Sequence, residues 1–154
     1  MKLFLCAVVL LFSVAVPATV DDALPPGLLD DRGRVVYLDF WASWCVPCAH
    51  SFPWLNEMRE RYGEHLVVVG VNVDADHADA ERFLNRHPAG FRIFYDPKGQ
   101  LAEHYHLRGM PSSVILDAQG NVIHRHEGFR ERDRAEYEAA IRQAIGVSPS
   151  SPSS

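Results

Sequence analysis

The chain has 154 residues, of which 47% are hydrophobic and 23% are charged, and its formal net charge is −5. This length suits a single domain with a hydrophobic core, and an acidic balance without a basic cluster argues against nucleic acid as a partner. Three cysteines are too few for a fold held together mainly by disulfides.

The N-terminal residues have the features of an export signal. Met1-Lys2 provides a positive start, and residues 3–16 are apolar apart from Ser13. Small residues follow at 16–18, so we predict a signal peptide over 1–18 and a periplasmic or exported protein that is soluble after cleavage. An uncleaved membrane anchor is the alternative, although the apolar run is short for a spanning helix. Residues 19–34 are predicted to be a short lead-in.

The first strand and the first helix are predicted on either side of residues 41–44. Residues 35–40 are nearly continuously apolar, which is typical of a strand covered on both faces, and Asp39 interrupts them. From Cys45 the apolar spacing becomes three to four residues, which predicts a helix kinked by a proline and ended by a glycine. The predicted core positions are Cys48, Phe52, Leu55, Met58 and Tyr62, the kink is at Pro53, and the end is at Gly63.

The rest of the chain alternates predicted strands and helices until a hairpin near the end. This alternation indicates parallel strands joined by right-handed crossovers, and the hairpin adds an antiparallel pair. The last helix carries an apolar stripe that includes Tyr137 and Ile141, and it is followed by a Ser/Pro tail over 147–154 that we predict to be disordered. The predicted strands are 66–73, 91–95, 113–117 and 122–126, and the predicted helices are 78–86, 100–106 and 131–145.

The most informative motif is Trp41-Ala-Ser-Trp-Cys45-Val-Pro-Cys48, at the predicted junction of strand and helix. Unpaired N–H groups and a partial positive charge at a helix N-terminus favour a thiolate, so Cys45 is the expected nucleophile. Cys48, one turn later, is the expected resolving thiol. We expect Cys48 to be shielded from solvent, whereas Cys45 should be exposed. A zinc site uses the same cysteine spacing but needs two further ligands. An inert structural disulfide is the other alternative.

The phrase Phe40-Trp-Ala-Ser-Trp-Cys-Val-Pro-Cys48 resembles the active site of the thioredoxin superfamily, and it is most similar to the exported TlpA/ResA branch. The resemblance covers about residues 35–146 and includes Gly109-Met-Pro-Ser112. It implies an α/β thioredoxin fold: a central mixed sheet with helices on both faces and an extra helix–strand insertion before Pro111. It implies a thiol:disulfide oxidoreductase without a cofactor, and we expect a monomer.

Asp39 lies six residues before Cys45, where thioredoxin has a buried acid that exchanges a proton with the second cysteine. The role implied by the resemblance is general base for Cys48. Burial alone should raise the pKa of a carboxyl inside a covered strand. The alternative is an aspartate that pairs with a basic side chain.

The resemblance also implies residues that contact substrate. Pro111 corresponds to the family's cis-proline, which would turn the backbone of Met110 towards the cysteines and an extended substrate segment. Trp44, Val46 and Pro47 would form an apolar lip around the cysteines. Trp41 is a better candidate for the core.

The expected reaction is reduction of disulfides in exported or periplasmic proteins, with apocytochrome c among the candidate substrates. Strong oxidants of the superfamily often place a histidine between the cysteines, whereas Val46 and Pro47 stand here, and this difference favours the reducing direction. The family implies a membrane dithiol protein as electron donor. A disulfide oxidant or isomerase, and a thioredoxin-fold binding or chaperone module, are the alternatives. Two His-x-His pairs, 104–106 and 124–126, are expected to be surface histidines, and no metal site is predicted.

Overall fold

The structure is a computed structural model that describes residues 25, 28 and 33–147. The predicted signal peptide, most of the lead-in and nearly all of the predicted tail lie outside the described residues. None of the described helices has the length and apolar character needed to span a membrane. The elements, in chain order, are β1 Val35–Trp41, α1 Val46–Tyr62, β2 Leu66–Asn72, α2 His77–Arg86, β3 Arg92–Tyr95, α3 Gln100–His104, β4 Ser112–Leu116, β5 Val122–Glu127, the 3-10 turn η2 Glu131–Asp133 and α4 Arg134–Ala144.

The five strands form one mixed sheet in the order β3-β2-β1-β4-β5. β2 is parallel to β1 and to β3, whereas β4 is antiparallel to β1 and to β5. This confirms the predicted mixed sheet with a C-terminal hairpin. The expected helix–strand unit before Pro111 is present as α2 and the edge strand β3, and its status as an insertion stays a prediction.

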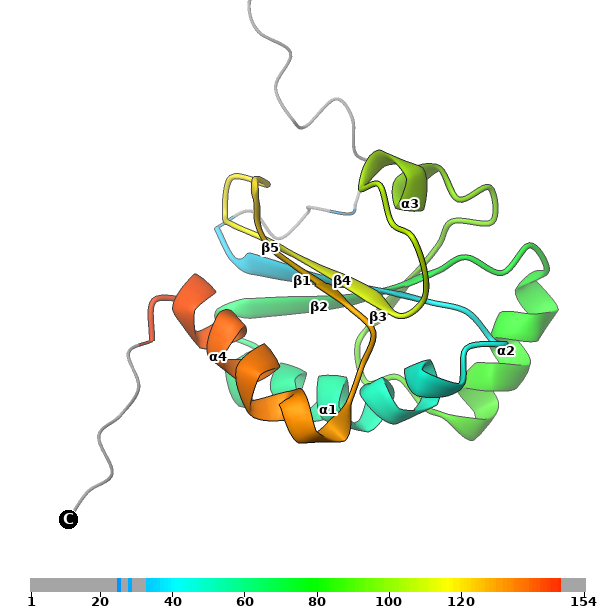
Figure 1. Cartoon of the computed structure of the whole chain (residues 1–154), viewed down its shortest axis with the longest axis horizontal. Coiled ribbons are helices and arrows are strands. Elements are labelled where there is room, and N and C mark those ends of the chain that lie inside the picture. The colour runs from blue at the N-terminus through cyan, green and yellow to red at the C-terminus, as the bar shows by residue number, and fades with distance from the viewer. Residues whose placement is uncertain (1–24, 26–27, 29–32, 148–154) are drawn as a thin grey trace, which may run out of the picture.

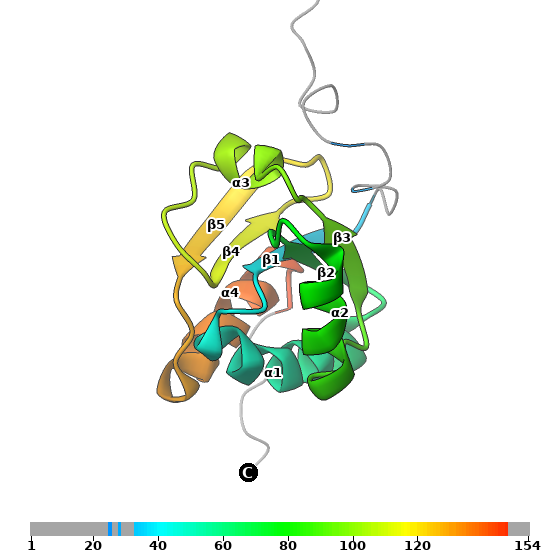
Figure 2. The ribbon, with the colours of Figure 1, turned by 90° about the vertical axis from the view of Figure 1, so that its right-hand side faces the viewer.

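Helices cover both faces of the sheet (Figures 1 and 2). α1 and α4 lie on one face and α3 on the other. α2 belongs to the first face, because its buried Phe83 packs with its ring centroid 4.8 Å from that of Trp41 and 5.2 Å from that of Phe52. Alternate side chains of β1 therefore enter two separate cores: Tyr37 and Trp41 face α1, and Leu38 and Phe40 face α3.

Local sequence explains where the helices begin and end. Pro47 is in the first turn of α1, where its missing N–H costs no hydrogen bond, and Gly63 follows the last turn. α2 begins after Asp76, whose carboxylate accepts a hydrogen bond from the Ala78 N–H at 2.9 Å. The predicted boundaries lie within three residues of the observed ones, and several coincide with them. The largest difference is at 131–133, which form a 3-10 turn before α4.

Candidate active site

Cys45 and Cys48 form a disulfide at the start of α1, with an S–S distance of 2.06 Å and Cα atoms 5.4 Å apart. β1 ends at Trp41, and a tight turn follows in which the Cys45 N–H donates to the Ala42 carbonyl at 3.1 Å. Cys45 is the N-cap residue of α1, with an extended backbone. After reduction, its sulfur would therefore lie where the helix dipole favours a negative charge.

The two cysteines differ less in exposure than expected. Cys48 is fully buried, but Cys45 is only 4% exposed, so the prediction of an exposed Cys45 is wrong for this disulfide form. The reason is that the Cys45 side chain turns inward to bond Cys48. The neighbouring Trp44 and Val46 are 68% and 72% exposed, and Pro47 is exposed as well. An apolar rim around the disulfide is therefore present, while its role in binding substrate stays a prediction.

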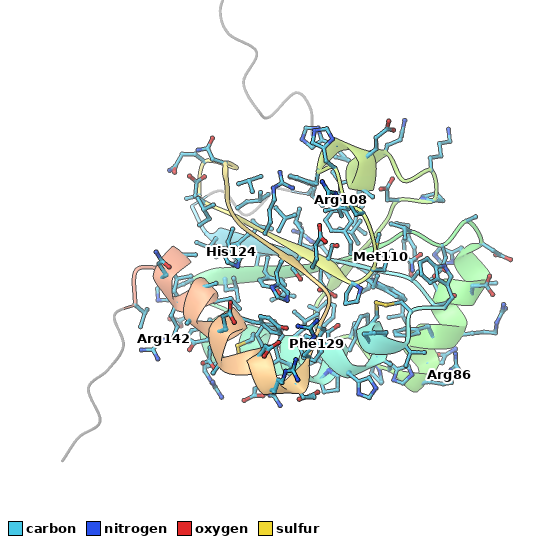
Figure 3. All side chains as sticks on the ribbon, in the orientation of Figure 1. Arg86, Arg108, Met110, His124, Phe129 and Arg142 are labelled. Atoms are coloured by element: carbon cyan, nitrogen blue, oxygen red, sulfur yellow. A yellow bond between two sulfur atoms is a disulfide. The ribbon has the colours of Figure 1, made fainter. Side chains whose placement is uncertain are left out.

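The Met110–Pro111 peptide bond is cis, as the resemblance implied. Met110 is partly buried and packs against the core that contains both cysteines (Figure 3). Two hydrogen bonds hold this loop: the Ser112 hydroxyl donates to the Gly109 carbonyl at 2.6 Å, and the Gly128 N–H donates to the Pro111 carbonyl at 2.8 Å. The loop between α3 and β4 is thus fixed to the end of β5.

Asp39 lies on the side of β1 that faces α1 and is 2% exposed. Burial raises the pKa of its carboxyl to about 7, and hydrogen bonds from Ser113 and Ser51 oppose this increase. The Ser113 hydroxyl donates to Oδ1 at 3.0 Å, and the Ser51 hydroxyl is 3.5 Å from Oδ2. Among the described residues, these serines are its side-chain partners, so the alternative of a basic partner is not observed.

Ser51 connects Asp39 to the resolving cysteine. Its hydroxyl donates to the Cys48 carbonyl at 3.0 Å and also lies within donating distance of Asp39 Oδ2, at 3.5 Å, so its single proton is shared between the two acceptors. The raised pKa of Asp39 makes its protonated form available near neutral pH as well.

A second buried carboxylate, Asp74, holds the turn before Cys45. Its Oδ2 accepts from the Ser43 N–H at 2.8 Å, and its Oδ1 accepts from the Ser43 hydroxyl at 2.9 Å. The Asn72 side-chain amide also donates to Oδ2 at 2.8 Å. This contact was not predicted from sequence. The sequence feature that could have indicated it is the polar Asn72-Val-Asp74 at the end of a strand parallel to β1. The ends of parallel strands meet at one edge of the sheet, which brings Asp74 close to the turn after β1.

The histidine pairs lie at the surface, apart from a partly buried His126. The His126 ring packs on the Tyr137 ring with centroids 4.1 Å apart, and burial lowers its pKa. Within the part of the chain that the structure describes, no three His, Cys, Asp or Glu side chains cluster in a way that could hold a metal ion.

Comparison with known proteins gives a consistent result. The Redoxin family model matches residues 25–141. The thiol-disulfide oxidoreductase ResA of Bacillus thuringiensis is 31% identical over 111 residues, which are 71% of this chain and 64% of that protein. The chain therefore spans less than two thirds of the length of this curated relative.

Solved structures show the same similarity. A putative thiol:disulfide interchange protein DsbE from Chlorobium tepidum matches with a TM-score of 0.74 and 48% identity, over 76% of this chain and 84% of that one. The exposed lipoprotein thioredoxin Etrx1 of Streptococcus pneumoniae matches with a TM-score of 0.63 and 32% identity, over 71% and 87% of the two chains. The five-stranded sheet and its flanking helices are a thioredoxin fold.

Proposed function

Because the chain belongs to the Redoxin family, we propose that it is a thiol–disulfide oxidoreductase that reduces disulfides in exported or periplasmic proteins. The observation that carries this proposal is the Cys45–Cys48 disulfide at the N-terminus of α1, packed in one core with Met110 of the cis-proline loop. The name of its ResA relative, a thiol-disulfide oxidoreductase, supports the same activity.

The first step uses Cys45. Its thiolate attacks one sulfur of the substrate disulfide, a bond forms between that sulfur and Cys45 Sγ, and the other substrate sulfur leaves as a thiolate that takes a proton from solvent. The position of Cys45 at the N-cap of α1 supports this assignment, since a thiolate there is stabilised by the helix dipole. Reduction must move Cys45 Sγ away from Cys48, and the exposed Trp44 and Val46 mark the surface that it would reach.

The second step uses Cys48 and Asp39. Asp39 removes the Cys48 proton, and the thiolate attacks Cys45 Sγ, which forms the intramolecular disulfide and releases the second substrate sulfur. The substrate gains two electrons and the cysteine pair loses two. A carboxyl with a pKa of about 7 is suited to this work, because it can both accept and release a proton near neutral pH.

Turnover requires a dithiol that reduces the Cys45–Cys48 disulfide again. We propose that a membrane dithiol protein supplies these electrons, as in the TlpA/ResA branch, and that Met110 and Pro111 pair with an extended segment of the substrate. Export is supported by the apolar residues 3–16. The reducing direction is supported by Val46 and Pro47, because neither stabilises a thiolate as a histidine between the cysteines does.

The decisive test is the reduction potential of the protein, measured against glutathione buffers by the emission of Trp44, which adjoins the pair. A value near or below about −270 mV is expected for a reductase, whereas one near −120 mV would identify an oxidant. No redox transition at all would contradict thiol exchange and favour a binding module. In that case, replacing both Cys45 and Cys48 with serine would leave function intact.

A further inference from the structure

A cleft of about 530 Å³ lies next to the turn that precedes Cys45. One wall is formed by Ser43 and Trp44 in the turn before Cys45, and the other wall is the exposed side of α2. Figures 1 and 2 show the connection between β1 and α1 passing alongside α2. The α2 residues that line the cleft are Asp79, Arg82, Asn85 and Arg86.

The wall that carries Trp44 is held in place although its indole is 68% exposed. Ser43 donates two hydrogen bonds to Asp74, at 2.8 and 2.9 Å, and Asp74 is itself buried at the end of β2. Together with Val46, which is 72% exposed, the indole leaves apolar area in water on both sides of Cys45. Trp44 is therefore presented at the mouth of the site, next to the nucleophile.

The opposite wall carries a net positive charge. Arg82 is paired with Asp79 one turn earlier, which neutralises both groups. Arg86, in the last turn of α2 (Figure 3), donates from Nε to the Arg82 carbonyl at 3.2 Å. Among the described residues, nothing bonds its terminal guanidinium nitrogens. The cleft thus has two cations and one anion on a chain with a net charge of −5.

We propose that this cleft binds the chain segment next to the substrate's reactive disulfide and selects segments that carry an acidic side chain. A guanidinium can bond both oxygens of a carboxylate, and the indole of Trp44 offers an apolar surface to the carbon atoms of the same segment. This inference rests on the proposed thiol–disulfide exchange and adds the chemical class of substrate. Because Trp44 directly precedes Cys45, a segment seated here would lie within reach of the nucleophile.

The expected selectivity is moderate, because the guanidinium of Arg86 is exposed to water and salt. An exposed ion pair changes an equilibrium by less than tenfold, so we expect an acidic segment to react roughly three to ten times faster than a basic one at low salt. The difference should shrink as the ionic strength rises.

The test uses the full chain in its reduced form and two disulfide peptides that differ only beside one cysteine, with Glu-Glu in one and Lys-Lys in the other. Stopped-flow tryptophan emission gives the second-order rate constant for each peptide. We expect the ratio of the two constants to favour the acidic peptide in the native protein, to reverse or vanish in Arg86→Glu, and to increase in Asp79→Asn. The ratio is the readout because any change in the Cys45 pKa affects both peptides alike.

Two controls separate this inference from the proposed function. Arg59→Glu makes the same charge change in the last turn of α1, more than three turns from the cysteines, and should leave the ratio as it is. The disulfide of 2-mercaptoethanol is uncharged, so its rate constant measures thiol–disulfide exchange without any contribution from substrate charge. Equal rates for both peptides, or an unchanged ratio in Arg86→Glu, would overturn the acidic selectivity while exchange itself persists. Failure to reduce any of the three disulfides would instead overturn the proposed function.

Discussion

The Ser113 hydroxyl donates a 3.0 Å hydrogen bond to Oδ1 of Asp39, from the residue directly opposite it in the antiparallel pairing of β1 with β4. The pairing of β4 with β1 therefore places a neutral hydrogen-bond donor, and not a positively charged group, beside the buried Asp39. Neutral partners reduce but do not cancel the effect of burial on the carboxyl pKa, which remains about 7.

Asp39 should make the protein less stable as the pH rises from about 4 to about 7. In the native state its pKa is raised from 3.8 to about 7, so the folded protein keeps a proton that the unfolded chain loses. The difference corresponds to at most about 4 kcal/mol, present below pH 4 and lost by about pH 8. We expect Asp39→Asn to remove this decline, so that urea unfolding gives a higher free energy than for the native protein at pH 8. The exposed Glu64→Gln should keep the decline.

Asp39→Asn should also slow the release of the mixed disulfide. Without a base, Cys48 must lose its proton to water, and a positioned general base contributes about 10²-fold or more. At pH 7 we expect resolution of a trapped Cys45–peptide disulfide to slow by roughly 100-fold, with attack by Cys45 little changed. The defect should shrink as the pH rises, because hydroxide can then remove the thiol proton without a protein base. An equal slowing of both steps would indicate general disruption of the site and not a lost base.

Ser113→Ala should raise the pH at which the resolving step becomes fast. The hydrogen bond from Ser113 favours the ionised carboxylate, so its loss raises the Asp39 pKa above 7. We expect the midpoint of the pH–rate profile to rise by about one pH unit, the equivalent of one hydrogen bond to a charged group. Ser113→Thr keeps the hydroxyl and serves as the matched control. A midpoint that moves as much in the threonine variant would assign the effect to packing.

Asp74→Ala should loosen the turn that presents Cys45. The substitution removes three hydrogen bonds, two from Ser43 and one from the buried Asn72 amide, and leaves that amide without an acceptor. We expect a loss of about 2–3 kcal/mol in the free energy of unfolding and faster hydrogen exchange at the Ser43 amide. Asp76→Ala, which removes only the cap of α2, should cost about 1 kcal/mol and leave Ser43 protected.

Sequence reasoning predicted the elements well because the local signals were strong. The change from a continuous apolar run at 35–40 to helical spacing after Cys45 is visible in any short window, and the structure places β1 and α1 there. The cis bond at Pro111 came from the resemblance alone, since cis X–Pro bonds are a small minority.

The contacts that could not be predicted from the sequence depend on the register between strands that are far apart in the chain. Ser113 is 74 residues from Asp39, and only the pairing of β4 with β1 makes them neighbours. The contact of Asp74 with Ser43 spans 31 residues between the ends of two strands in the same way. The low exposure of Cys45 was missed for another reason: it depends on the oxidation state of the pair, which no sequence pattern records.

The alternation of side chains along β1 has an evolutionary consequence. Tyr37, Asp39 and Trp41 face the helix that carries the cysteines, whereas Leu38 and Phe40 face the opposite core. Substitutions in that second core can change the free energy of unfolding without contacting Asp39, Cys45 or Cys48. The stability of the fold can therefore vary among relatives while the surroundings of the cysteine pair stay the same.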